Sequence, residues 1–149
     1  MNHYARLAAM TVLMFVAMFA LMYAMVDTLD NVFPNLNQVY MAGLMTAPMV
    51  LIELALMGSM YKSRAANAAI AVVSIIAFAV FWLGIRQQLA IADAQFLKSM
   101  IPHHAGAILM CGQAPVQDEE VKSLCQNIIR SQQSEIDQMK AILARLDHS

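Results

Sequence analysis

The stretch LAAMTVLMFVAMFALMYAMV, residues 7–26, is twenty residues long and its only polar interruptions are Thr11 and Tyr23. A helix of this length spans about 30 Å, which matches the hydrocarbon core of a bilayer. A signal peptide is the alternative, but its apolar core is usually about 7–15 residues long, and no A-x-A-like site precedes Asp27. We therefore predict a first membrane span over residues 7–26.

Two more apolar segments follow, over residues 39–61 and 68–85. The chain is 60% hydrophobic and 13% charged, whereas soluble proteins carry about 25% charged residues. Most of the charges come after residue 85. We predict an all-α protein with a three-span region over residues 1–85 and a water-exposed helical domain over residues 86–149. A net charge of −1 with scattered Lys and Arg excludes a nucleic-acid-binding surface.

Charges in the short loops predict the orientation. The first loop carries Asp27 and Asp30 without a basic residue, and the second loop carries Lys62 and Arg64. Because loops rich in Lys and Arg stay in the cytoplasm, the amino terminus and the second loop are assigned to that side. The domain after residue 85 then lies on the opposite side, which is the periplasm for a protein of the bacterial inner membrane.

The sequence of the exported domain predicts two helices. No Gly or Pro occurs between Ile85 and Pro102, so we expect the third span to continue without a break into the first domain helix. Pro115 follows the end of that helix, and Asp118 is the expected N-cap of a final helix that reaches about Leu146. The short turn between them makes the two helices antiparallel neighbours.

Metal-binding side chains fall on the facing stripes of these two helices. Thioether sulfur favours monovalent copper, and imidazole suits copper and zinc alike. A mixed His and Met set therefore predicts copper before zinc or iron. The residues that share these faces at about 100° per residue are Asp93, Met100, His103, His104 and Met110 on the first helix, and Gln132, Glu135 and Met139 on the second.

The runs DAQFLKSMIPHHAGAILM, residues 93–110, and VKSLCQNIIRSQQSEIDQM, residues 121–139, resemble the bacterial family called domain of unknown function 305. Its pattern combines M-x-P-H-H with a downstream Q-x-x-E-I-x-x-M. Members resemble ferritin-like helical bundles, and several are linked to periplasmic copper binding and copper resistance. The resemblance implies a metal-binding role for Met100, His103, His104, Met110, Glu135 and Met139. The membrane half lies outside the resemblance.

Three further residues are candidates for structure or function. Cys111 and Cys125 flank the predicted turn in an exported domain, where thiols oxidise, so we expect a disulfide between them. Glu53 lies inside the predicted second span, where a carboxylate is costly and functional by default.

These features predict a membrane-anchored, homo-oligomeric protein that sequesters copper for tolerance or exchanges it with a periplasmic donor or acceptor protein. A ferritin-like metal oxidase or peroxide-handling enzyme is the alternative, although the domain has no E-x-x-H and Glu135 is its main acidic candidate. A second alternative is an accessory membrane subunit whose hairpin docks a partner and binds no metal.

Overall fold

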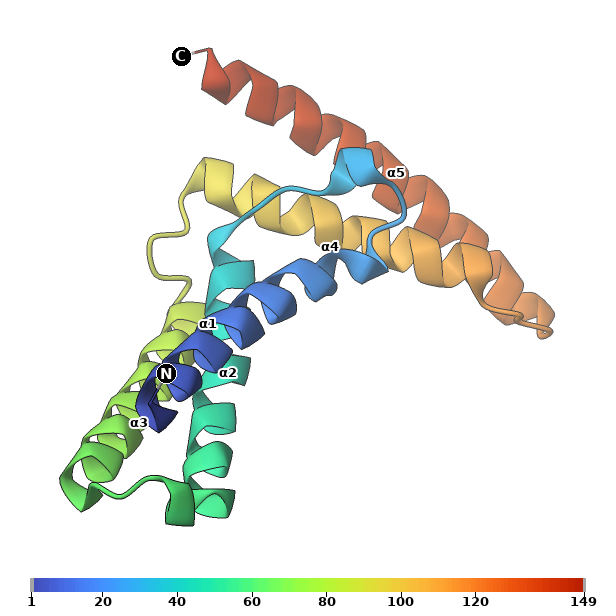
Figure 1. The fold of residues 1–149 in the computed structure, drawn as a ribbon. Helices are drawn as coiled ribbons and strands as arrows, with labels where there is room; N and C mark the ends of the chain where they lie inside the picture. Colours follow the sequence, from blue (N-terminus) through green and yellow to red (C-terminus); the bar gives the residue numbers. More distant parts are fainter. Residues whose placement is uncertain (1, 149) are drawn as a thin grey trace. The chain divides into compact units, whose positions relative to one another are not determined.

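The computed structural model describes residues 2–148, and within that range the chain forms five α-helices and no strand (Figure 1). It divides into two compact units. The first contains the residues up to Met22 together with Asn37–Ala90, and the second contains Tyr23–Leu36 together with the residues from Ile91 onward. The loop between the first two candidate spans therefore packs with the carboxyl-terminal helices.

Three helices of the described chain are long and apolar enough to cross a membrane. They are α1 (His3–Leu21), which continues as the short helix η1 (Met22–Met25), α2 (Leu36–Leu56) and α3 (Arg64–Gln87). Their mean hydropathies are 2.2, 1.8 and 2.6, and many of their large apolar side chains point outward. The predicted spans are confirmed as helices. The second was extended too far, because α2 ends at Leu56 and Tyr61 lies beyond the short helix η3 (Gly58–Met60).

Tyr61 is buried in a cluster at one end of the three spans. Its ring lies 5.4 Å from that of Tyr4, whose hydroxyl donates to the Asn67 side-chain oxygen at 2.9 Å. Residues of α1, of α3 and of the loop between α2 and α3 thus meet at the same end. The alternating topology predicted from the loop charges requires this arrangement.

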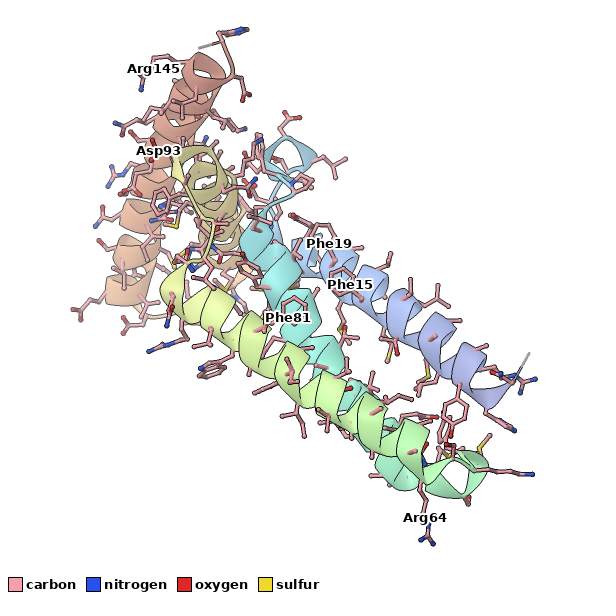
Figure 2. All side chains as sticks on the ribbon, turned by 90° about the vertical axis from the view of Figure 1, so that its left-hand side faces the viewer. Phe15, Phe19, Arg64, Phe81, Asp93 and Arg145 are labelled. Atoms are coloured by element: carbon pink, nitrogen blue, oxygen red, sulfur yellow. The ribbon has the colours of Figure 1, made fainter. Side chains whose placement is uncertain are left out.

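A close approach between α2 and α3 occurs at Gly43. A Cβ atom built there would lie 2.3 Å from the ring of Phe81, whose side chain is labelled in Figure 2. Only a glycine leaves room for that ring without a movement of the ring or of one helix.

The prediction that α3 continues into the next helix is wrong. Helix α3 ends at Gln87, and α4 begins at Asp93. Gln88 and Ala90 have φ angles of 50° and 56°, so the chain turns through left-handed conformations that interrupt the helix. The turn is stabilised by tertiary contacts, because the Tyr40 hydroxyl donates to the Leu89 carbonyl at 2.6 Å. No glycine or proline lies at this break, so the sequence did not predict it.

Helices α4 (Asp93–Gln113) and α5 (Glu119–Asp147) form the antiparallel hairpin that was predicted (Figure 1). Asp93 at the start of α4 and Arg145 near the end of α5 mark the open end of the hairpin (Figure 2). Asp118 caps α5, since its carboxylate accepts hydrogen bonds from the amides of Glu120 and Val121 at 3.0 Å.

The hairpin core consists of apolar side chains at helical spacing on the two facing stripes. Ile101 and Ile136 are fully buried at its centre. The complete buried set is Leu97, Ile101 and Ala105 from α4, and Ile136, Met139 and Leu143 from α5.

Candidate metal centre

His104 is the buried polar residue at the α4–α5 interface, and both of its ring nitrogens have partners. Nδ1 lies 2.9 Å from the carbonyl oxygen of Met100, one turn earlier on α4. Because a carbonyl only accepts hydrogen bonds, Nδ1 carries the proton of this contact. Nε2 lies 2.7 Å from a carboxylate oxygen of Glu135 on α5. The ring is therefore oriented by its own helix and presents Nε2 to the facing helix.

Glu135 is oriented by a residue that the sequence did not single out. The Ser131 hydroxyl donates to one carboxylate oxygen at 2.9 Å, and the other oxygen faces His104. The hydrogen bond from Ser131, followed by the contact with His104, lowers the pKa of Glu135 below its ordinary value. The S-x-x-x-E spacing on one helix face was the available signal for this pair.

This geometry is the one that metal-ligating histidines use. Such a ring donates one N–H to a backbone carbonyl or a carboxylate, and its other nitrogen binds the ion. In His104 the Nδ1 N–H donates to the Met100 carbonyl, so Nε2 is the ring nitrogen that would bind an ion. Nε2 faces the Glu135 carboxylate, and a cation that bound there would lie between the two groups.

Two methionines lie one turn away from this pair. The His104–Glu135 contact defines the register of the antiparallel helices. Met100, one turn before His104, therefore lies at the level of Met139, one turn after Glu135. Met139 is 9% exposed, and both methionines contact the hairpin core. The interface thus combines an imidazole, a carboxylate and two thioethers from two helices.

Three other predicted ligands lie outside this group. His103 is exposed, and its ring meets that of His104 edge-on at 6.1 Å between centroids. Met110 is 54% exposed and lies about 9 Å further along α4 than His104 at the helical rise. Asp93, labelled in Figure 2, lies in the first turn of α4, about 16 Å from His104 along the axis. Asp93 cannot share an ion with His104 in this arrangement.

A metal ion at this position would also need ligands other than His, Cys, Asp and Glu side chains. Within residues 2–148 no three His, Cys, Asp or Glu side chains gather closely enough to hold a metal ion. A metal bound at His104 and Glu135 would therefore need thioether sulfur or solvent to complete its coordination. Thioether sulfur at this position would favour a soft, monovalent ion.

Pro102, next to His103, lies inside α4 and does not break the helix. Proline lacks the N–H that would pair with the carbonyl of Lys98, four residues earlier. The side-chain amide of Asn35 donates to that carbonyl at 3.2 Å and to the Phe33 carbonyl at 2.9 Å. A residue far away in the sequence thus satisfies the acceptor that the proline leaves open.

Other contacts attach the loop between α1 and α2 to the same helix. The Leu36 amide donates to the Gln95 side chain at 3.0 Å, and Val26 and Phe33 pack against the hairpin core. At Gly106 an added Cβ would lie 3.4 Å from the Met25 carbonyl. Because this loop and the hairpin pack in one unit, both lie on the same side of the membrane if the helices span it.

Cys111 and Cys125 meet across the hairpin near its turn. Both are free and partly buried. The neighbouring Cys125 thiol, together with burial, raises the pKa of the Cys111 thiol. The predicted disulfide joins residues that do lie together, and it stays a prediction.

Glu53 lies one turn from the end of α2, where the Tyr61 hydroxyl donates to its carboxylate at 3.1 Å. This bond supplies a polar partner near the end of the span. A functional role for Glu53 within the membrane stays a prediction.

The fold and these residues define an all-helical protein with three candidate membrane spans and a hairpin whose facing helices carry His, Glu and Met side chains. The chain belongs to the family described as Domain of unknown function (DUF305), whose model matches residues 85–148. The "Uncharacterized protein L153" of Acanthamoeba polyphaga mimivirus is 38% identical over 111 residues, which cover 73% of this chain and 71% of that protein. This similarity extends beyond the hairpin into the half of the chain that carries the candidate membrane spans. No solved structure matches the chain.

Proposed function

We propose that the α4–α5 hairpin binds monovalent copper through Nε2 of His104 and the sulfurs of Met100 and Met139, with Glu135 beside the ion. The observation that carries this proposal is the orientation of His104, whose Nδ1 faces the Met100 carbonyl and whose Nε2 faces Glu135. Binding requires an imidazole nitrogen directed at the facing helix and soft sulfur within one helical turn, and the register of the hairpin supports both.

His103 and Met110 have a different part in this proposal. Both are exposed on the same helix as His104. Exposed donors can exchange an ion with a donor or acceptor protein, while the buried donors retain it. The function is therefore copper sequestration or transfer, which supports copper tolerance, and not catalysis. Asp93 acts at most as a surface carboxylate at the open end of the hairpin.

The proposed location is the bacterial inner membrane, with the hairpin in the periplasm. The acidic first loop packs with the hairpin, and the basic second loop belongs to the other unit. The positive-inside rule then assigns the hairpin to the non-cytoplasmic side. The hairpin contributes two helices, so a ferritin-like bundle would require a second copy of the chain, in keeping with a homo-oligomer.

Titration of the full chain in detergent with monovalent copper, against a chromophoric competitor, tests the proposal. We expect His104→Ala to weaken binding at this site by at least tenfold, because it removes the buried nitrogen. The matched control is His103→Ala, which removes the exposed imidazole and is expected to have a smaller effect on affinity. Equal losses for the two variants, or none for either, would contradict the assignment.

A further inference from the structure

A cavity of about 330 Å³ lies between the three candidate spans. Side chains from α1, α2 and α3 all line it, and two of them, Phe15 of α1 and Phe81 of α3, are labelled in Figure 2. Pockets that hold small molecules have volumes of about 300–1,000 Å³, so this cavity suits a small or narrow ligand. Every lining residue belongs to the first compact unit, so the cavity lies wholly within the three-helix region.

The cavity lies at the level of the middle of the three helices. Thr11, Thr46 and Ser74 line it, and each of them is close to the midpoint of its own helix. In a helix that spans a bilayer, the residues at the midpoint are surrounded by the hydrocarbon core, which is about 30 Å thick. A ligand at this depth would therefore enter from the hydrocarbon and not from water.

The wall of the cavity has no hydroxyl hydrogen to offer a ligand. Thr11, Thr46 and Ser74 each donate to the backbone carbonyl four residues earlier in the same helix, at 2.8, 2.7 and 2.8 Å. A hydroxyl has a single O–H group, so these three donors are already used. The other lining residues are glycine, alanine, valine and phenylalanine, and none is charged. The wall therefore suits an apolar ligand.

The rim of the cavity is continuous with the outward apolar surface of the spans. Val12 of α1 and Val73 of α3 line the cavity and are 62% and 64% exposed. Thr46, Ala47 and Ser74, which also line it, are buried. Apolar side chains this exposed on a membrane span face lipid. A ligand can thus pass from the bilayer over the exposed valines to the buried part of the wall.

We propose that this cavity binds one acyl chain of a bilayer phospholipid, whose headgroup stays at the membrane surface. An apolar cavity excludes water, and an unfilled one loses the dispersion contacts of its wall. An acyl chain is narrow, flexible and already present at this depth, so it restores those contacts. Because the lipid binds the folded three-helix unit, it also stabilises the packing of α1 against α2 and α3.

Small side chains keep the space open. Gly43 and Ala47 lie one turn apart on α2, and Ala77 lies one turn before Phe81 on α3; all four line the cavity. The Phe81 ring already lies against Gly43. A larger side chain at Ala77, which is partly buried, would occupy the volume that is open to a ligand.

Native mass spectrometry of the full chain in detergent tests the proposal. Delipidated protein is mixed with palmitoyl-oleoyl phosphatidylethanolamine, and the bound lipid is counted after the micelle is removed. We expect the wild-type protein to retain one lipid and Ala77→Phe to lose it, because the ring fills the cavity. Ala69→Phe is the matched control, since it places the same ring on an exposed position of α3 and should retain the lipid. Thr11→Phe fills the cavity from α1 and should also lose it.

Circular dichroism and thermal unfolding check that each variant folds. Added lipid should raise the melting temperature of the wild-type and Ala69→Phe proteins and leave that of Ala77→Phe unchanged. If Ala77→Phe does not fold, the result for Thr11→Phe decides.

Three results would overturn the proposal. The first is a wild-type protein without bound phospholipid, including one that binds only free oleate in a parallel titration. The second is retention of the lipid by the folded cavity variants. The third is a lipid-free dimer that Ala77→Phe dissociates, which would show that a helix of a second copy fills the cavity.

Discussion

The side-chain amide of Asn35 donates a hydrogen bond to the carbonyl oxygen of Lys98, 3.2 Å away and 63 residues later in the chain. That carbonyl is free because Pro102 has no N–H to offer it. The proline of the M-x-P-H-H pattern therefore has a structural use. It exposes an acceptor on α4 that the loop between α1 and α2 recognises.

The first prediction follows from this bond. Asn35→Ala leaves the Lys98 carbonyl without its partner, and we expect a loss of about 1–3 kcal/mol in the free energy of unfolding. Pro102→Ala restores the helical N–H, so in that background Asn35→Ala should cost less. Denaturant unfolding of the full chain, arranged as a double-mutant cycle, measures the difference. Asn127→Ala, on the exposed surface of α5, is the control. Identical costs in the two backgrounds would contradict the proposed coupling.

The second prediction concerns Ser131. Its hydroxyl is the leading cause of the lowered pKa of Glu135, so Ser131→Ala should raise that pKa toward the ordinary value of 4.5. A lowered carboxylate pKa stabilises the fold at pH values above the unfolded-state pKa, and the benefit is lost as the pH falls through the folded-state pKa. In Ser131→Ala that loss should begin at higher pH.

Carbon NMR of the Glu135 carboxyl group measures this pKa directly in the metal-free protein. Glu135→Gln removes the titration and identifies the signal. An unchanged pKa in Ser131→Ala would show that the serine does not orient the carboxylate.

The third prediction concerns the packing of α2 against α3. Gly43→Ala would place a methyl group 2.3 Å from the Phe81 ring, so the ring or a helix must move. We expect a loss of about 1–3 kcal/mol, which Phe81→Leu should partly restore. Gly58→Ala is the matched control, because an added Cβ there meets nothing within 4 Å. Thermal unfolding in detergent checks the order of stability. A Gly43→Ala protein as stable as the Gly58→Ala protein would refute the close approach.

The fourth prediction concerns topology. In a chain with both native cysteines changed to serine, Asp30→Cys and Ser59→Cys place single thiols on exposed loops at opposite ends of the spans. A membrane-impermeant maleimide applied to bacteria whose outer membrane has been permeabilised should label residue 30 and leave residue 59 unlabelled. The reverse pattern would put the hairpin in the cytoplasm and remove the periplasmic proposal.

Local signals were sufficient for most of the helices. Uninterrupted apolar runs predicted the three spans, and Asp118 predicted the start of α5, because both depend on neighbours within a few residues. The break after α3 did not follow from such signals. Gln88 and Ala90 adopt left-handed conformations in a turn that Tyr40 helps to hold from another helix.

For the candidate site, too, the sequence predicted some features and only the structure showed the others. The sequence predicted that the M-x-P-H-H residues face the downstream glutamate and methionine, since residue type and helical period put them on facing stripes. The sequence did not predict which of these residues are buried, because burial depends on the partner helix. His104 is buried against Glu135, whereas its neighbour His103 is exposed.

The sequence by itself determined that the chain is helical, that three segments suit a bilayer, and that His and Met side chains share the facing stripes of its last two helices. Those properties come from composition and from a period of 3.6 residues, which local chain geometry sets. Tertiary structure decided that Asn35 pairs with Lys98 and that His104 faces Glu135. Each of these contacts joins residues far apart in the chain, so it exists only once the helices and the connecting loop have packed.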